Sequence, residues 1–453
     1  MNEIASTATP RPSASLPGSP LLHRKLDAFF RLSERGTTVR TEVIAGITTF
    51  LTLAYIIFVN PQILGQAGMD KGAVFVATCL AGAIACFVMG LYANFPIAMA
   101  PGMGLNAFFT FTVVLTYQFS WQEALGAVFC SGILFVLISW FKIREAIINA
   151  FPMGLKMATS AGIGLFLGII ALQSGGLVVQ HPATLVTLGD LTAPAVVLMV
   201  TGFILVTVLN QRRIAGGTVL GILVVAIAGI PFGLTQFNGI ISMPPSILPT
   251  FLQMDFGRIT ELGFWIVVMT LLFVDLFDTA GTLIGVGHRA GLLEKDGRLG
   301  EMKKALMADS TATVVGATLG TSNTGSYVES AAGVSVGGRT GLVAVVVGVC
   351  FLFALFLSPL AGMIPGYATA GALLYVACIM VQALTQIDWD DMTEYVPGVV
   401  CALAMPLTYS IAAGIGLGII SYVGIKLATG HRKDVSWTLG ILALAFALFF
   451  AVS

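Results

Sequence analysis

Charged residues are scarce in this sequence. Asp, Glu, Lys and Arg make up 10% of its 453 residues and hydrophobic residues make up 57%, whereas about a quarter of the residues in soluble domains are charged. This composition excludes an ordinary soluble domain and predicts a membrane protein surrounded by a lipid bilayer. The formal net charge of zero argues against nucleic acid as a partner, because nucleic-acid-binding domains carry basic surfaces.

Residues that bind metals or form catalytic nucleophile–base sets are also few. The six cysteines all lie in apolar runs and form no CxxC pair, and the four histidines occur in polar stretches without an HExxH pattern. We interpret the cysteines as small packing residues. The sequence therefore predicts no metal site, no cofactor and no enzymatic activity.

The N-terminal region lacks the early apolar stretch of a cleavable signal peptide. Residues 1–40 begin with a Pro/Ser/Ala-rich stretch and end with several arginines and a lysine that precede the first apolar run. Because basic residues favour the cytoplasmic side of a membrane, we expect 1–40 to be a cytoplasmic polar tail.

Long apolar runs fill the rest of the chain, most of them near the roughly 20 residues that a helix needs to cross a bilayer. Seven runs precede a polar, Pro-rich connection at 236–262, expected to be extracytoplasmic, and seven follow it. Basic clusters follow even-numbered runs, which indicates a multi-pass protein with a cytoplasmic N-terminus. A further apolar segment at 431–453 either crosses the membrane or lies along it. The fourteen runs lie near 43–59, 73–92, 97–116, 123–141, 157–173, 195–209, 218–232, 264–285, 304–319, 325–338, 340–358, 366–384, 397–410 and 411–428.

The two halves resemble one another in three places. ATSAGIGLFLGIIALQ from Ala158 matches ATAGALLYVACIMVQ from Ala368, and two further pairs follow in the same order. Small-residue helices also resemble each other by chance, but three ordered matches favour a repeat. Because seven is odd, the second copy must be inverted, and inverted repeats place substrate near the middle of the bilayer.

The third run of each half is broken by residues that do not suit a continuous span. The stretch 93–109 contains Pro96, Pro101 and two nearby glycines, and 320–338 contains small and polar residues. Irregular backbone inside a membrane is tolerated where it lines a cavity, and a half-helix would begin near each break. The alternative is a polar loop that stays outside the membrane.

Acidic residues occur inside two of these apolar segments. Asp275, Asp278 and Thr282 fall at i, i+3 and i+7, on one face of a helix, and Glu329 lies at the break of the tenth run. Acids in a membrane mark transport or proton pathways. The structural alternative is a carboxyl group bonded to Ser or Thr hydroxyls, which for Asp275 is as well supported as a functional role. Asp309 is expected to orient a helix.

Four stretches carry a resemblance to a known family: GTTVRTEVIAGITTFLTLAYIIFVNPQIL (36–64), APGMGLNAFF (100–109), FVDLFDTAGTLIGV (273–286) and GTSNTGSYVESAAGVSVGGRTGL (320–342). They resemble the AzgA-type adenine/guanine/hypoxanthine permeases, a branch of the nucleobase–cation symporter (nucleobase–ascorbate transporter-like) family. The resemblance runs from about residue 24 to the C-terminus.

The resemblance implies an all-α polytopic membrane protein with 14 transmembrane segments in two inverted repeats of seven, and with short strands at the breaks of spans 3 and 10. It implies a core domain that moves against a gate domain. The core domain comprises spans 1–4 (41–141) and 8–11 (263–360), and the gate domain comprises spans 5–7 (142–235) and 12–14 (361–430).

The resemblance also implies the site and the activity. It assigns substrate binding to Glu329, Asp278, Thr282, Asn106, Phe108, Tyr327, Phe50 and Thr49, and proton coupling to Asp278, Glu329 and Asp275. The implied activity is uptake of a purine base with a proton across a bacterial-type inner membrane. The alternatives are an anion carrier of the same architecture, for sulfate or bicarbonate, and a uracil or xanthine carrier. The sequence leaves open whether the protein forms a homodimer.

Overall fold

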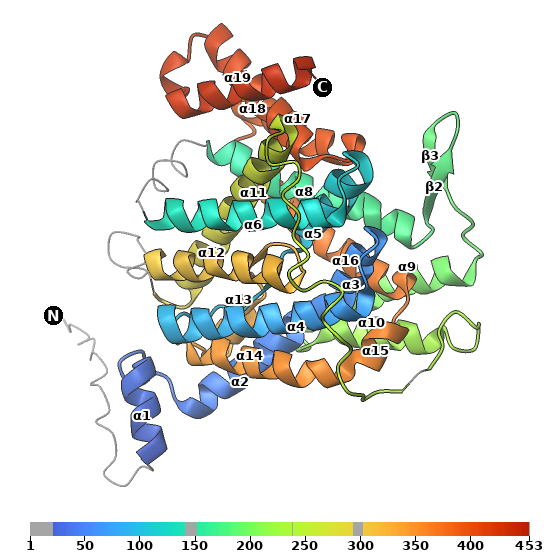
Figure 1. The fold of residues 1–453 in the computed structure, drawn as a ribbon, viewed down its shortest axis with the longest axis vertical. Coiled ribbons are helices and arrows are strands. Elements are labelled where there is room, and N and C mark those ends of the chain that lie inside the picture. Colours follow the sequence, from blue (N-terminus) through green and yellow to red (C-terminus); the bar gives the residue numbers. More distant parts are fainter. Residues whose placement is uncertain (1–20, 141–151, 238, 293–301, 453) are drawn as a thin grey trace, which may run out of the picture.

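The computed structural model describes residues 21–140, 152–237, 239–292 and 302–452. Most long helices run side by side across the molecule, and their ends form two opposite faces (Figure 1). One helix, α1 (Leu21–Phe30), runs nearly perpendicular to them beside the N-terminus. The predicted polar stretch at 1–20 and parts of two basic connections, 141–151 and 293–301, lie outside the described residues.

The first half of the chain forms helices in the order that the apolar runs predicted. The third run is a short strand, a short helix and a π-helical stretch, and the fifth and sixth spans are joined by a hairpin of two strands. The elements are α2 (Val39–Leu53), α3 (Ile56–Gln66), α4 (Lys71–Val88), η1 (Met89–Ala93), β1 (Met99–Pro101), α5 (Met103–Ala107), η2 (Phe108–Thr116), α6 (Trp121–Trp140), α8 (Met153–Ser174), β2 (Val178–His181), β3 (Leu185–Leu188), α9 (Pro194–Gln211) and α10 (Gly217–Ala228).

The second half repeats this order, including the break in its third run. The elements are α11 (Leu262–Arg289), α12 (Met302–Leu319), β4 (Thr324–Ser326), α13 (Ser330–Ser335), α14 (Leu342–Ala354), η3 (Leu355–Leu357), α15 (Ser358–Met363), α16 (Gly366–Val381), η4 (Gln382–Gln386), α17 (Met392–Thr408), α18 (Ile411–Ala428), η5 (Arg432–Asp434) and α19 (Trp437–Val452).

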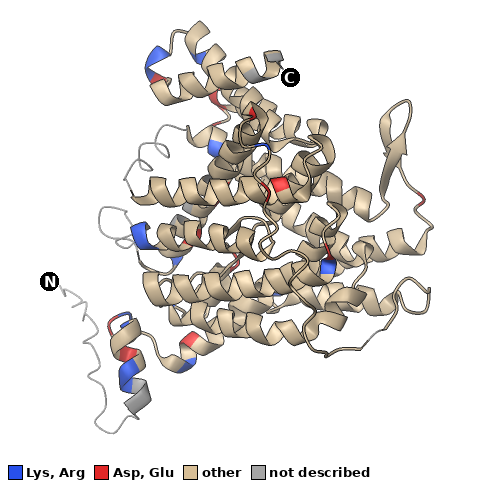
Figure 2. Cartoon of the chain, viewed as in Figure 1, with Lys and Arg blue, Asp and Glu red and all other residues tan. Residues whose placement is uncertain are grey.

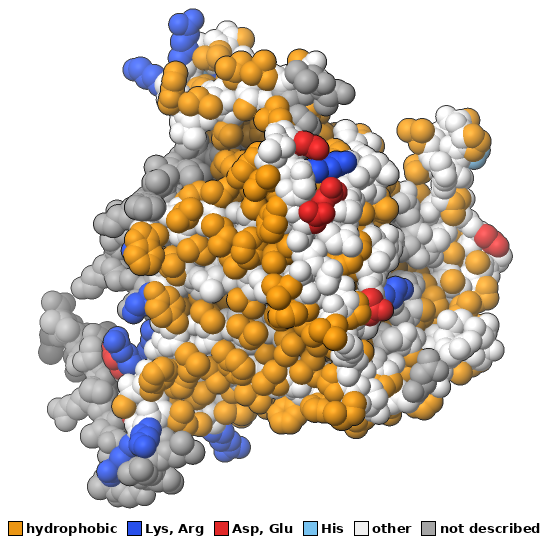
Figure 3. Space-filling model, in the orientation of Figure 1, with side chains coloured by type: hydrophobic (Ala, Val, Ile, Leu, Met, Phe, Trp, Pro, Cys, Tyr) orange, Lys and Arg blue, Asp and Glu red, His pale blue; other side chains and the backbone are white. Residues whose placement is uncertain are grey.

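The helices have the length and surface of a membrane protein. Within the described ranges, nine helices are long and apolar enough to cross a bilayer, and three shorter apolar helices accompany them. Apolar side chains cover much of the flank of the molecule, whereas Lys and Arg gather mainly at the face beside the N-terminus (Figures 2 and 3). The predicted all-α polytopic fold is confirmed.

The two broken runs meet at a crossing of two short strands. Strands β1 and β4 pair antiparallel, with Met99 opposite Ser326 and Pro101 opposite Thr324. Each strand is followed by a short helix, α5 or α13. The pairing joins the third span of one half to the tenth span of the other through backbone hydrogen bonds, and it confirms the strands expected at these breaks.

Helices pack in two groups. Helices α2, α3, α4, α6, α11, α12 and α14 contact one another, and a second group comprises α8, α9, α10, α16, α17 and α18. Glycine permits the closest approaches. A side chain on Gly341 would come within 2.1 Å of the carbonyl oxygen of Gly90, so the backbones of η1 and the start of α14 touch there. That the two groups move as core and gate domains stays a prediction.

Candidate functional site

Glu329 lies where β4 turns into α13. Its Oε1 accepts a hydrogen bond of 2.7 Å from the Tyr55 hydroxyl. Tyr55 lies in the two-residue break between α2 and α3, so the bend of the first span carries the hydroxyl group to the tenth span. The carboxylate is half-buried, which leaves part of it accessible.

Asp278 occupies the exposed face of α11. Gly281 and Gly285 follow it at i+3 and i+7 and are also exposed, and a Cβ atom on either glycine would meet no described atom within 4 Å. Helical neighbours at this spacing share one face. On this face of the helix, the carboxyl group of Asp278 is therefore followed by two glycines that leave the backbone uncovered; we call this face the bare stripe of α11.

Asp278 is exposed and lies near two other acids. Its carboxyl group lies within electrostatic range of Asp275 and Glu329. Within the described part of the chain, Asp278 has no hydrogen bond or ion pair. The structure thus places the carboxyl groups of Asp278 and Glu329 near each other, on α11 and at the start of α13.

Three tyrosines surround Glu329. Tyr327 and Tyr55 lie within electrostatic range of its carboxyl group, and Tyr375 of α16 does so from the second helix group. The Tyr327 hydroxyl donates a hydrogen bond of 2.5 Å to the carbonyl oxygen of Pro101 in β1. Sequence reasoning predicted Tyr327 as a contact and gave no role at the site to Tyr55 or Tyr375, because aromatic residues are common packing residues in membrane helices.

Two further acids lie behind strand β4 and are fully buried. Asp275 accepts hydrogen bonds from Thr313 and Asn323, at 3.0 and 3.1 Å. Asp309 accepts hydrogen bonds from Thr279 and Ser326, at 2.8 and 3.0 Å.

Both carboxyl groups lie close to the backbone of β4. A Cβ atom on Gly325 would lie 3.2 Å from one Asp275 oxygen and 3.7 Å from an Asp309 oxygen. These contacts support a positioning role for both acids, in which α11 and α12 hold the strand that leads to Glu329.

The segment before β4 forms hydrogen bonds to α3, to α5 and to the residue that caps the N-terminus of α5. The Thr321 hydroxyl accepts from Asn60 of α3 at 2.9 Å, the Ser322 hydroxyl donates to Asn106 of α5, and the backbone oxygen of Asn323 accepts from Gly102. Asn106 is fully buried, and its amide nitrogen has no partner among the described residues. This NH₂ group is therefore available to water or to a ligand.

The other predicted contact residues are covered by protein. Thr282 is 8% exposed, and Phe108 and Thr49 are fully buried. Thr49 lies against Gly333 of α13, and its hydroxyl has no partner among the described residues. Phe50 packs edge-on against Phe351 of α14, with ring centroids 5.3 Å apart. The role of these four residues in binding stays a prediction.

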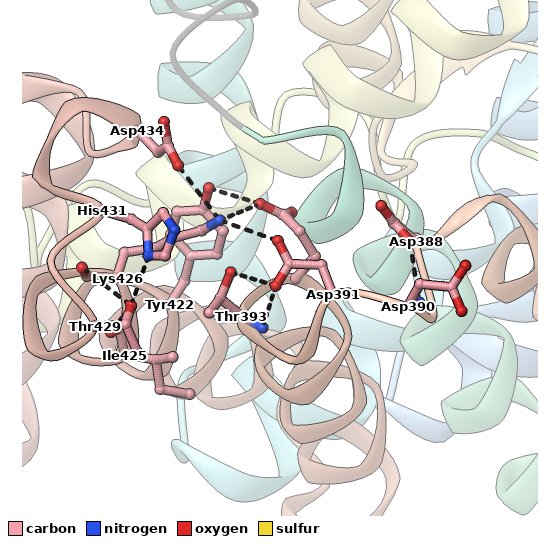
Figure 4. A network of polar contacts seen from close by, with 11 residues as sticks. Asp388, Asp390, Asp391, Thr393, Tyr422, Ile425, Lys426, Thr429, His431 and Asp434 are labelled. Atoms are coloured by element: carbon pink, nitrogen blue, oxygen red, sulfur yellow. Dashed lines mark hydrogen bonds and ion pairs between the residues drawn. The ribbon is translucent and has the colours of Figure 1, made fainter.

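An open pocket of about 650 Å³ lies away from these acids, beside α8, α18 and the segment that leads into α19. A charged cluster adjoins it (Figure 4). The Lys426 ammonium group, at the end of α18, lies 2.9 Å from Glu394, 3.7 Å from Asp391 and 3.5 Å from Asp434. Since the buried lysine already has three carboxylate partners, we assign the cluster a structural role.

In the ranges that the structure covers, no three His, Cys, Asp or Glu side chains come together as metal ligands would. The groups near Asp278 and Glu329 are carboxyl, hydroxyl, amide and aromatic groups.

Comparisons with known proteins give the family. The model of the "Permease family" matches residues 40–417. The chain is 48% identical to the adenine permease AdeP of Escherichia coli, over 93% of this chain and 95% of that protein. It is 46% identical to the guanine/hypoxanthine permease PbuG of Bacillus subtilis, over 94% of this chain and 99% of that protein.

Solved structures of similar fold are more distant in sequence. The transmembrane domain of the cyanobacterial bicarbonate transporter BicA superposes with a TM-score of 0.62 at 14% identity, covering 84% of this chain and 97% of that domain. SLC26A9 gives a TM-score of 0.61 at 11% identity, over 92% and 73%. These likenesses concern the fold alone. On the family match and the sequence identities, the chain belongs to the permease family and is a transporter, not an enzyme.

Proposed function

We propose that the protein takes up a purine nucleobase together with a proton across the inner membrane. The relatives named as adenine permease and as guanine/hypoxanthine permease support the substrate class. The observation that carries the proposal is that the carboxyl groups of Asp278 and Glu329 lie within electrostatic range of each other, and we infer that the two acids line one substrate cavity.

The groups at this cavity suit a flat neutral base. A purine presents ring and amino N–H donors along its edge, and a carboxylate accepts such hydrogen bonds. Glu329, held by Tyr55, is placed to accept them. Tyr375 is partly exposed and lies within electrostatic range of Glu329, so its ring is the aromatic group to which we assign stacking against a heteroaromatic base.

Asp278 is the residue that we assign to proton coupling. It is accessible in the cavity and has no partner among the described residues, so gaining or losing a proton breaks no hydrogen bond of the protein that the structure describes. Asp275 is tied to Thr313 and Asn323, which makes it a weaker candidate for the coupled proton.

Alternating access is part of this proposal, with the inferred cavity assigned to the contact between the two helix groups. Asp278 and Glu329 belong to the group of α2 and α11, and Tyr375 belongs to the group of α8 and α16. Movement of one group against the other would expose the cavity to each side in turn. The gathering of Lys and Arg at the face beside the N-terminus supports a cytoplasmic N-terminus.

An anion such as bicarbonate or sulfate is the rival substrate, because BicA shares the fold. The charges that act on Asp278 are those of two other acids, with no lysine or arginine of the described residues among them. Such surroundings repel an anion. A uracil or xanthine carrier of this family is the second rival, and the cavity residues do not separate it from a purine carrier.

Uptake in a host without its own purine transport tests the proposal. Labelled adenine should accumulate, and unlabelled guanine or hypoxanthine should compete if the site accepts both. A proton uncoupler should abolish accumulation. Competition by uracil or xanthine alone would assign the other branch of the family, and inhibition by sulfate or bicarbonate would assign an anion site. Accumulation that persists with the uncoupler would contradict proton coupling.

A further inference from the structure

Helix α1 lies across one end of the helices that fill the rest of the molecule. It runs nearly perpendicular to the long helices, at the face where basic side chains gather (Figures 1 and 2). If the long helices cross the bilayer, α1 lies parallel to the membrane surface. The proposed function does not involve this helix.

The inner side of α1 is fixed to the protein by apolar contacts. Phe30 and Leu32 are almost fully buried against Leu342 at the start of α14, and Leu26 and Val39 pack beside them. This packing fixes the position of α1 against the N-terminal end of α14.

Hydrogen bonds attach the end of α1 and the loop after it, residues 30–35, to both halves of the chain. The Asn94 amide donates to the carbonyl oxygen of Phe30 at 3.1 Å, and its oxygen accepts from the backbone of Gly341 at 2.7 Å. The guanidinium of Arg35 donates to the carbonyl oxygens of Asn94 and Arg339, at 2.7 and 3.0 Å. These bonds connect the end of the second span, at Asn94, with the start of the eleventh, at Gly341. They hold α1 to the rest of the structure, so it is not a loose tail.

The outer side of α1 combines basic and apolar exposure. Arg24, Lys25 and Arg31 are exposed, and Phe29 keeps 56% of its surface accessible. The acid of this helix, Asp27, is turned into the following loop, where both of its oxygens accept hydrogen bonds of 2.7 Å from Ser33. The helix itself therefore exposes the basic residues Arg24 and Lys25, and the turn after it exposes Arg31 together with the acid Glu34.

We propose that α1 is an interfacial helix that binds the anionic headgroups of the lipid leaflet on its own side of the membrane. A helix with basic residues and an exposed aromatic residue binds at the boundary between headgroups and acyl chains. Arg24, Lys25 and Arg31 meet headgroup phosphates, and the ring of Phe29 enters the boundary. Each basic residue near an anionic surface contributes about fivefold to such binding.

Hydrogen exchange on the full-length protein tests this directly. The chain is placed in nanodiscs of phosphatidylcholine alone and of an equal mixture of phosphatidylcholine and phosphatidylglycerol. Backbone exchange in residues 24–32 should be at least about tenfold slower in the mixture, because several basic residues add their contributions. High salt should remove most of the difference, since it screens exposed charges.

Two variants and a control define the result. R24S/K25S/R31S should exchange equally in both lipids, and Phe29→Ser should lose part of the protection in the mixture. The control R212S/R213S changes exposed arginines away from α1 and should keep the difference. Equal exchange of the wild type in both lipids would overturn the proposal, as would an unchanged difference in R24S/K25S/R31S. The measurement needs no substrate, so it stands or falls independently of the transport proposal.

Discussion

The Tyr55 hydroxyl donates a hydrogen bond of 2.7 Å to Glu329, although 274 residues separate the two in the sequence. Tyr55 lies at the break of the first span and Glu329 lies at the start of the half-helix in the tenth. The bond joins the two repeats at the cavity and fixes one oxygen of the carboxylate, which leaves the other available to a substrate.

Replacing Tyr55 with Phe should weaken transport by removing this bond. Hydrogen bonds to charged groups contribute about 1.5–3 kcal/mol, so we expect the apparent affinity for the base to fall roughly tenfold to a hundredfold, measured as the concentration for half-maximal uptake. Tyr92→Phe, at an exposed tyrosine, is the matched control and should transport normally. Unaltered affinity in Tyr55→Phe would show that Glu329 does not depend on this bond.

Filling the space beside Gly281 should block transport without unfolding the protein. A side chain at this position meets no described atom within 4 Å, and replacing a helical glycine removes a cost of about 1 kcal/mol relative to alanine. Gly281→Leu should therefore keep or raise the melting temperature in detergent while uptake falls at least about tenfold. Gly263→Leu, on the same helix and equally free of close contacts, should leave uptake intact. If both variants transport alike, the bare stripe of α11 does not line the cavity.

Removing the carboxylate of Asp309 should destabilise the strand crossing. Asp309→Ala leaves the Thr279 and Ser326 hydroxyls without their acceptor, and unsatisfied buried groups cost about 1–3 kcal/mol each. We expect a lower melting temperature and weaker substrate binding. Thr318→Ala, which removes a hydroxyl bonded only within α12, is the control and should change little. Wild-type stability in Asp309→Ala would remove the positioning role.

Lys426 should be essential for the stability of the cluster at the end of α18. The lysine side chain is 4% exposed and has carboxylates from Asp391, Glu394 and Asp434 within 4 Å. Lys426→Met leaves these acids without their cation. Because the side chains of Glu394, Asp391 and Asp434 are 21%, 43% and 49% exposed, solvent screens the loss and we expect destabilisation of about 1 kcal/mol. Thermal unfolding should show this loss, and adding Glu394→Gln should restore part of it. A double variant less stable than Lys426→Met would contradict the arrangement.

The sequence singled out Asp278 and Glu329 as candidate acids of the site but not the residues that contact them. Asp278 and Glu329 were recognisable because carboxyl groups are rare in apolar segments. Tyr55 and Tyr375 gave no such signal, since most aromatic residues in membrane helices serve packing, and Phe50 does pack against Phe351. Their approach to Glu329 depends on the bend of the first span and on contact between the two helix groups.

The fold could be predicted more completely than the site. Apolar length and basic residues gave the order of the helices, and the prolines and glycines of 93–109 and 320–338 located the breaks. The pairing of Met99 with Ser326 could not be read from either segment, because a register of two or three residue pairs is set by neighbours distant in sequence. Asp309 likewise looked like a helix-orienting acid until Thr279 and Ser326 were seen beside it.

The central claim is that Asp278 carries the coupled proton while Glu329 binds the base. Proteoliposomes containing a pH-sensitive dye measure it most directly, with purine added outside and proton entry recorded. We predict that the wild type and Asp190→Asn, a change at an exposed loop acid, admit protons with the purine. Glu329→Gln should fail in both proton entry and purine exchange. Asp278→Asn should still exchange labelled purine across the membrane but admit no protons with it. Purine-driven proton entry at the wild-type rate in Asp278→Asn would contradict the account.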